Sequence, residues 1–145
     1  MSLLDDKRYL GFDYGEKRIG VACGNSVTES ASSLGIVKND SGTPDWQKLD
    51  EWVEQWQPAA LIVGDPLTKE GEVAEITRQA RGFAKRLGKR YQLPVHMIDE
   101  RFSSMAAAEV IRVQRQQKSR GRSKSGDLDR VSAALLTEQW LHDNN

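Results

Sequence analysis

The sequence has little of what disulfide-bonded and zinc-binding proteins are built from: one cysteine and two histidines among 145 residues. A single cysteine excludes an internal disulfide framework, and a zinc site would need more cysteine and histidine than the chain contains. Cys23 and His96 fall within predicted strands, and His142 lies near the end of the sequence. We therefore expect structural or surface roles for all three, rather than nucleophilic or acid-base catalysis.

A signal peptide is also missing, because Met1–Tyr9 contains acids where a long apolar run would be needed. We therefore expect a cytoplasmic protein with no membrane association. Hydrophobic residues make up 38% of the chain and charged residues 29%, which argues against disordered, collagen-like and membrane classes. The length predicts one domain, residues 1–145.

Net charge is absent as well, since 21 basic residues balance 21 acidic ones, so bulk charge gives no reason to expect an anionic partner. The charge is unevenly distributed, however. Between Arg101 and Gly126 the chain has seven cations and one acid, Glu109. Such clustering indicates nucleic-acid binding better than the total charge does, although a solvated loop is the alternative.

Hydrophobic periodicity predicts a three-layer α/β fold with a mixed five-stranded sheet in the order βββαβαβαα. The first three strands form an antiparallel meander, and the last two follow helical crossovers and are parallel to the first. The predicted strands are Arg8–Tyr14, Ile19–Gly24, Leu34–Lys38, Ala59–Gly64 and Pro94–Ile98. The predicted helices are one from Thr43 as N-cap and Pro44 to Pro58, Glu72–Tyr91, Ser103–Val113 and Asp127–His142, with a mobile basic loop at about 114–126.

Carboxylates follow the three strands that are predicted to be mutually parallel: Asp13, Asp65 and the pair Asp99–Glu100. The carboxyl ends of such strands face one crevice, where ligands bind. Converging acids repel one another, and a hard divalent cation such as Mg²⁺ relieves that repulsion. Taken one at a time, each acid could instead be an ordinary loop or cap residue.

The last predicted helix offers a further acid. Asp129 lies at helical spacing with Ala133, Leu136 and Trp140, so an apolar stripe leads to a carboxylate on the sheet-facing side. A buried acid needs a partner or a metal. Asp127 is better placed to cap the helix N-terminus.

The segment DYGEKRIG, Asp13–Gly20, lacks the glycine spacing of Rossmann and Walker loops. It resembles the first phosphate loop of actin-like and sugar-kinase ATPases. Those enzymes need two such lobes and this length supplies one, so no nucleotide cofactor is expected.

Four motifs in order resemble the YqgF/RuvX family of RNase H-like proteins: FDYGEKRIGVA (Phe12–Ala22), IVGDPL (Ile62–Leu67), DERFSS (Asp99–Ser104) and the cluster Asp129, Ser132, Ala133, Ala134. Proteins of this family are described as Holliday junction resolvases or as nucleases that mature the 5′ end of pre-16S ribosomal RNA. The resemblance implies an RNase H-like fold with metal-binding, catalytic acids at Asp13, Glu100 and Asp129. Asp65 departs from the family pattern, which usually has an apolar residue there; it could be an extra metal ligand or could cap the following turn.

The resemblance implies a metal-dependent endonuclease that acts on structured RNA, with two Mg²⁺ (or Mn²⁺) ions as cofactors. The alternatives are a resolvase of branched DNA and a non-catalytic nucleic-acid-binding ribosome or transcription factor. We expect a monomer or weak homodimer. The expected phosphate contacts are Lys17, Arg18, Arg101, Arg115, Lys118, Arg120, Arg122 and Lys124.

Overall fold

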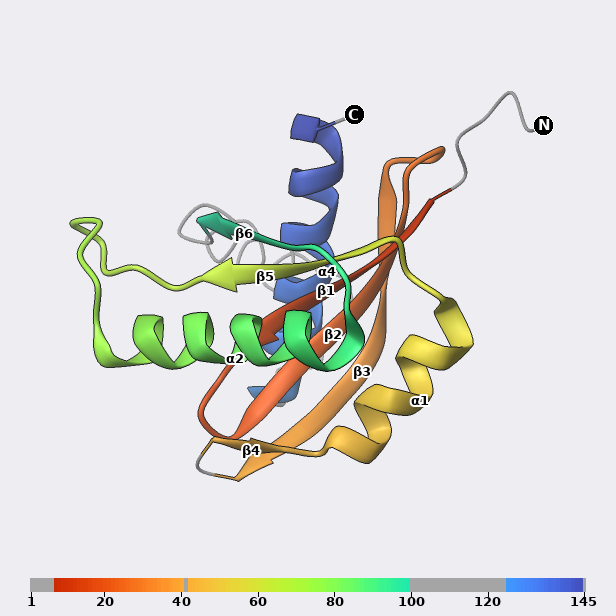
Figure 1. Cartoon of the computed structure of the whole chain (residues 1–145). Helices are drawn as coiled ribbons and strands as arrows, with labels where there is room; N and C mark the ends of the chain where they lie inside the picture. Colours follow the sequence, from red (N-terminus) through yellow and green to blue (C-terminus); the bar gives the residue numbers. More distant parts are fainter. Residues whose placement is uncertain (1–6, 41, 100–124, 145) are drawn as a thin grey trace, which may run out of the picture.

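The computed structural model describes residues 7–40, 42–99 and 125–144, with the backbone alone for 125–131. A six-stranded sheet in the order β4-β3-β2-β1-β5-β6 forms its centre (Figure 1). The strands are β1 (Arg8–Tyr14), β2 (Arg18–Asn25), β3 (Ser30–Asp40), β4 (Thr43–Pro44), β5 (Ala60–Asp65) and β6 (Val95–Asp99). The helices are α1 (Trp46–Trp56), α2 (Glu75–Tyr91) and α4 (Ser125–Asn144).

The strand directions confirm the predicted mixed sheet. β1, β2 and β3 pair antiparallel, whereas β5 pairs parallel with both β1 and β6. The count of five strands was wrong, because Thr43 and Pro44 pair with β3 as the short strand β4. The helix predicted to open at these two residues instead begins at Trp46, and the side chain of its N-cap, Asp45, accepts a hydrogen bond from the Lys48 backbone N–H.

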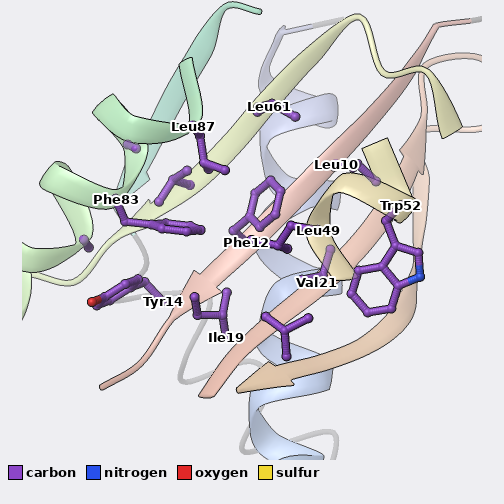
Figure 2. Packing of buried hydrophobic residues seen from close by; sticks show 14 residues of the cluster. Leu10, Phe12, Tyr14, Ile19, Val21, Leu49, Trp52, Leu61, Phe83 and Leu87 are labelled. Carbon is purple, nitrogen blue, oxygen red and sulfur yellow. The ribbon is translucent and has the colours of Figure 1, made fainter. Parts of the chain in front are cut away.

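One face of the sheet is covered by α1 and α2 and the other by α4 (Figure 1). On the first face, alternate residues of β1 point into the main core, where the Phe12 and Tyr14 rings lie 5.8 and 5.2 Å from the Phe83 ring of α2. Figure 2 shows this packing together with Leu49 and Trp52 of α1. The alternation therefore sends the other residues of β1 towards α4.

Helix α4 lies close against β1 and β2 because glycines face it. A Cβ atom at Gly11 would lie 1.7 Å from Thr137 Oγ1, and one at Gly24 would lie 2.8 Å from Thr137 Cγ2. Thr137 is fully buried and donates its hydroxyl to the Ala133 carbonyl. The two glycines thus set how near α4 comes to the strand that ends in Asp13 and Tyr14.

The predicted helix Ser103–Val113 lies outside the described residues, as does the basic loop up to residue 124. Helix α4 begins at Ser125, two residues before the expected start, so the loop does not extend to Gly126. Within the described segments, no helix is long and apolar enough to cross a membrane.

Candidate functional site

Asp13 stands one residue before the end of β1, where it pairs across the hairpin with Gly20 of β2. Its side chain is half-buried. In β1 it alternates with Gly11 and Tyr9, and these two residues meet Thr137 and Trp140 of α4. Asp13 therefore belongs to the α4 side of the sheet.

Asp65 and Asp99 are the last residues of β5 and β6 and are register partners. Asp65, however, belongs to the α2 side, in step with Leu61 and Val63 of the main core. Both of its carboxylate oxygens accept a hydrogen bond from Arg81 of α2, Oδ1 from Nε and Oδ2 from Nη2, each at 2.9 Å. The structure thus places Asp65 and Asp13 on opposite sides of the sheet.

Strand β6 shows the same alternation. Val95 packs against the α2-side core, whereas the His96 ring stacks on Trp140 of α4 with 4.9 Å between centroids. Asp99 is in step with Val95, and hence with the α2 side. Glu100, the other acid of this pair, lies outside the described residues.

Asp129 lies in the first part of α4, residues 125–131, where the structure describes the backbone alone. The apolar stripe that was predicted to continue from Asp129 is confirmed further along the helix. Ala133 and Leu136 are fully buried, and Trp140 packs on Tyr9 and His96. Asp129, Ala133 and Thr137 are spaced four residues apart, so they follow one another along one face of the helix. Asp129 lies two turns before the residue that touches Gly11, towards the strand end that carries Asp13.

Two predicted phosphate contacts lie at the tight turn between β1 and β2: Lys17 is in the turn and Arg18 is the first residue of β2, and both side chains are exposed. A Cβ atom at Gly15 would lie 2.6 Å from the Arg18 carbonyl oxygen, so the turn closes only around glycine. The buried residue Asn39 of β3 stabilises this turn through two hydrogen bonds. Its backbone N–H donates to the Lys17 carbonyl at 2.9 Å, and its Nδ2 donates to the Gly15 carbonyl at 2.6 Å.

An open groove of about 1230 Å³ lies between this turn, the end of β3 and helix α2. Its lining includes four cations, two acids and two glycines: Tyr14, Glu16, Lys17, Arg18, Ile36, Lys38, Asn39, Asp40, Gly42, Gln79, Gly82 and Arg86. The apolar periodicity of α2 does not predict this groove. The charge of the helix does indicate it, because α2 carries six cations against the single acid Glu75.

The remaining predicted contacts, Arg101, Arg115, Lys118, Arg120, Arg122 and Lys124, lie outside the described residues. Among the side chains that the structure does describe, no three from His, Cys, Asp and Glu are grouped so as to hold a metal ion. Burial raises the pKa of the Cys23 thiol, which disfavours the thiolate that a cysteine nucleophile needs.

Comparison with known proteins gives a consistent result. The model of a family described as "RuvX: Holliday junction resolvase" matches residues 7–143. A Legionella pneumophila (strain Paris) protein is 43% identical over 133 residues, covering 92% of this chain and 94% of that protein. A Pseudomonas putida protein is 39% identical over 142 residues, covering 98% and 99%. Both are named "Putative pre-16S rRNA nuclease".

Solved structures share the fold. Thermus thermophilus RuvC in complex with a Holliday junction substrate aligns with a TM-score of 0.57 at 17% identity, covering 94% of both chains. The yeast mitochondrial Holliday junction resolvase aligns with a TM-score of 0.54 at 11% identity, covering 93% of this chain and 78% of that one. The predicted RNase H-like architecture is therefore confirmed.

Proposed function

Because the chain belongs to the RuvX family, we propose that it is a metal-dependent endonuclease that hydrolyses phosphodiester bonds in the 5′-end processing of pre-16S ribosomal RNA. The observation that carries this proposal is the identity of 39–43% over nearly the whole chain to proteins named for that activity. The position of Asp13 supports it, at the strand ends that α4 approaches.

In this proposal Asp13, Glu100 and Asp129 hold the divalent cations. Asp13 lies on the α4 side of the sheet, and α4 carries Asp129 towards the same strand end. Alternation along β6 puts Asp99 in step with the α2 side, so of the two neighbouring acids we assign Glu100 to the site. Asp65 is left out, because Arg81 occupies both of its oxygens on the opposite side.

Hard divalent ions fit a donor set made of carboxylates, and two Mg²⁺ or Mn²⁺ ions would supply an activated water and neutralise the charge that develops on the phosphate. The protein's own task is then positioning. Asp13 is set by the β1–β2 pairing and by the approach of α4, and it precedes a turn that Gly15 and Asn39 keep tight. Lys17, Arg18 and Arg101 would hold substrate phosphates, which fixes the register of the strand without reading its sequence.

Cleavage of four-way DNA junctions is the second candidate, favoured by the description of the family and by the RuvC fold. Symmetric cleavage of a junction needs two active sites, and therefore a dimer. Large apolar side chains that are exposed in the described part are Val27, Val73 and Met97, which lie on three separate segments. RNA processing is the first choice because the relatives of 39–43% identity are named for that activity.

Purified protein incubated with a pre-16S rRNA fragment, a four-way DNA junction and an unstructured single strand, each with Mg²⁺, Mn²⁺ or EDTA, tests both candidates. We expect cleavage near the mature 5′ end of the rRNA fragment that requires the metal and is absent in Asp13→Asn. Preferential, symmetric cutting of the junction would replace the first proposal by the second. Binding without cleavage of any substrate would favour a non-catalytic factor.

A further inference from the structure

We propose that the groove between the β1–β2 turn and α2 binds the phosphate backbone of the substrate strand beyond the cleavage site. This inference rests on the proposed function for the nature of the ligand. The groove adjoins the β1–β2 turn that follows Asp13, and Tyr14, Asn39 and residues of α2 line it on the α2 side of the sheet. Arg18 and Lys38, which also line it, are register partners. Arg18 is in step with Gly20, the partner of Asp13, so these two cations lie on the same side of the sheet as Asp13. A strand held at Asp13 can therefore cross the turn at Lys17 and Arg18 and continue into the groove.

The charge of the groove suits a polyanion. Four cations line it, Lys17, Arg18, Lys38 and Arg86, against the two acids Glu16 and Asp40. Lys17, Lys38 and Arg86 form no ion pair within the segments that the structure describes. Exposed cations without a carboxylate partner are available for phosphate, and counterion release makes such contacts favourable at low salt.

Helix α2 extends this cationic surface along its length. Its six exposed cations fall into two groups, and Arg78, Arg81 and Arg90 are paired with Glu75, Asp65 and Asp50. The other three have no carboxylate partner among the described residues: Lys85, Arg86 and Lys89. The cationic surface therefore continues beyond the groove in the direction of the helix axis.

Arg86 is held in place at the groove wall. Its Nη1 donates to the Gly42 carbonyl at 2.8 Å, and its guanidinium lies 5.8 Å from the centre of the Trp46 ring. A guanidinium has five N–H donors in a fixed plane, so the one bond to Gly42 leaves others for a phosphate oxygen. Fixing the side chain beforehand reduces the entropy lost when it binds.

Size and shape favour a polymer over a small anion. The volume of about 1230 Å³ exceeds the range of about 300–1,000 Å³ that is usual for small-molecule sites, and the groove is open to solvent. Gly82 of α2 lines it without a side chain, and a Cβ atom built there would meet nothing within 4 Å. A backbone can therefore approach the helix closely at this point.

Gly82 also supplies the test, because it can be replaced without a clash. Gly82→Glu places a negative charge in the groove, and Gly82→Gln places a neutral side chain of the same length there. Gln55→Glu makes the same change of net charge on an exposed position of α1, away from the groove. Fluorescence anisotropy with labelled oligo(U) and oligo(A) RNA, in Ca²⁺ to prevent cleavage, measures the affinity of each variant.

We expect Gly82→Glu to weaken binding about three- to five-fold at low salt relative to Gly82→Gln, equally for both sequences, and this difference to shrink as salt rises. Gln55→Glu should bind like wild type. Lys38→Ala should reduce the slope of log K against log [salt] by about 0.7, the share of one phosphate on a single strand. Circular dichroism and melting curves show whether each variant is folded.

Equal affinities for Gly82→Glu and Gly82→Gln, with an unchanged slope in Lys38→Ala, would overturn the groove proposal. The outcome is separable from that of the nuclease proposal. A protein that cleaves RNA but ignores these substitutions refutes the groove alone. One that cleaves nothing, yet loses salt-dependent affinity in Gly82→Glu and Lys38→Ala, retains the groove and refutes the nuclease.

Discussion

Arg81 donates hydrogen bonds to both carboxylate oxygens of Asp65, from Nε to Oδ1 and from Nη2 to Oδ2, at 2.9 Å each. The pair ties the last residue of β5 to α2, on the side of the sheet opposite the one that faces α4. Neither of the two sequence-based readings of Asp65 described this contact. The carboxylate is engaged by a neighbouring helix, while the following turn is closed by the Asp65 backbone carbonyl, which accepts from Leu67 N–H at 3.0 Å.

The first prediction compares the two aspartates at the ends of neighbouring parallel strands. Asp13→Asn should abolish cleavage while leaving the fold and substrate binding nearly intact, because under the proposed function the Asp13 carboxylate would hold a divalent cation, and a neutral amide is a weaker ligand for such an ion. Asp65→Asn should keep near wild-type turnover, because its partner is Arg81. Cleavage rates at saturating Mg²⁺, with melting curves for both variants, measure this. Equal loss of activity would restore Asp65 to the metal site.

A second prediction tests the register of α4. Asp129→Ala should reduce activity far more than Asp127→Ala, since only Asp129 continues the stripe of Ala133 and Leu136, which are both buried. A direct readout is metal affinity, followed by calorimetric titration with Mn²⁺, which should weaken in Asp129→Ala only. If the two variants lost activity and affinity to the same degree, the assignment of Asp129 by helical spacing would be wrong.

Much of the fold follows from local sequence patterns. The bounds of β1 are as predicted, because apolar alternation runs from Tyr9 to Tyr14 and Gly15 ends it. The start of α1 was misplaced, since Thr43 and Pro44 carry a helix-start signal that long-range pairing with β3 overrides. Helix α2 starts at Glu75 instead of Glu72, because the Glu72 backbone N–H and carbonyl are both engaged with Thr68 in a preceding turn.

The candidate site was predicted only at the level of strand ends. That acids would converge there follows from parallel strands, but the side of the sheet on which each acid lies depends on single-residue register. Asp65 and Asp99 are the last residues of their strands and are in step with core residues of the α2 side. The partner of Asp65, Arg81, is sixteen residues away in sequence, and no local pattern reveals such a contact.

The third prediction concerns the close approach of α4 to β1. Gly11→Ala should destabilise the protein by about 1–3 kcal/mol, because the new Cβ atom would overlap the Thr137 side chain. Thr137→Ala should relieve part of this cost, which a double-mutant cycle measured by urea unfolding would detect. Gly82→Ala is the matched control and should stabilise α2 by about 0.5–1 kcal/mol, because its Cβ meets nothing. Independent, additive effects in the cycle would contradict the contact.

The fourth prediction follows from the cluster that joins α1 to α2. Asp50 accepts from Arg90 Nε and Nη2 at 2.9 and 2.7 Å and from the Tyr91 hydroxyl at 2.6 Å. Hydrogen bonds from Arg90 lower the pKa of Asp50 below its ordinary 3.8, whereas burial, followed by the bond to Asp50, raises the pKa of Tyr91 above its ordinary 10.0. Both shifts stabilise the folded state between these two values.

The Asp50 contribution should be complete above pH 3.8 and disappear as pH falls below it, and the Tyr91 contribution should disappear as pH rises above 10.0. The free energy of unfolding, measured against pH, should therefore fall less steeply at acid pH in Asp50→Asn than in wild type. In Tyr91→Phe it should fall less steeply at alkaline pH. An unaltered pH dependence in both variants would show that neither pKa shift contributes to stability.

The last prediction separates two cationic surfaces, the groove beside α2 and the segment from Arg115 to Lys124, which has five cations and no acid. If that segment contacts phosphates, replacing Lys118, Arg120 and Arg122 with alanine should flatten the slope of log K against log [salt] by about 2–3 units, for three contacts at roughly 0.7 to 0.9 each. The loss should be the same for all sequences of one structural class, because phosphate contacts carry no base readout. Combining this triple variant with Lys38→Ala should lower the slope further, by an independent increment. An unchanged slope in the triple variant would make the segment a solvated linker and would leave the groove as the surface that holds the strand.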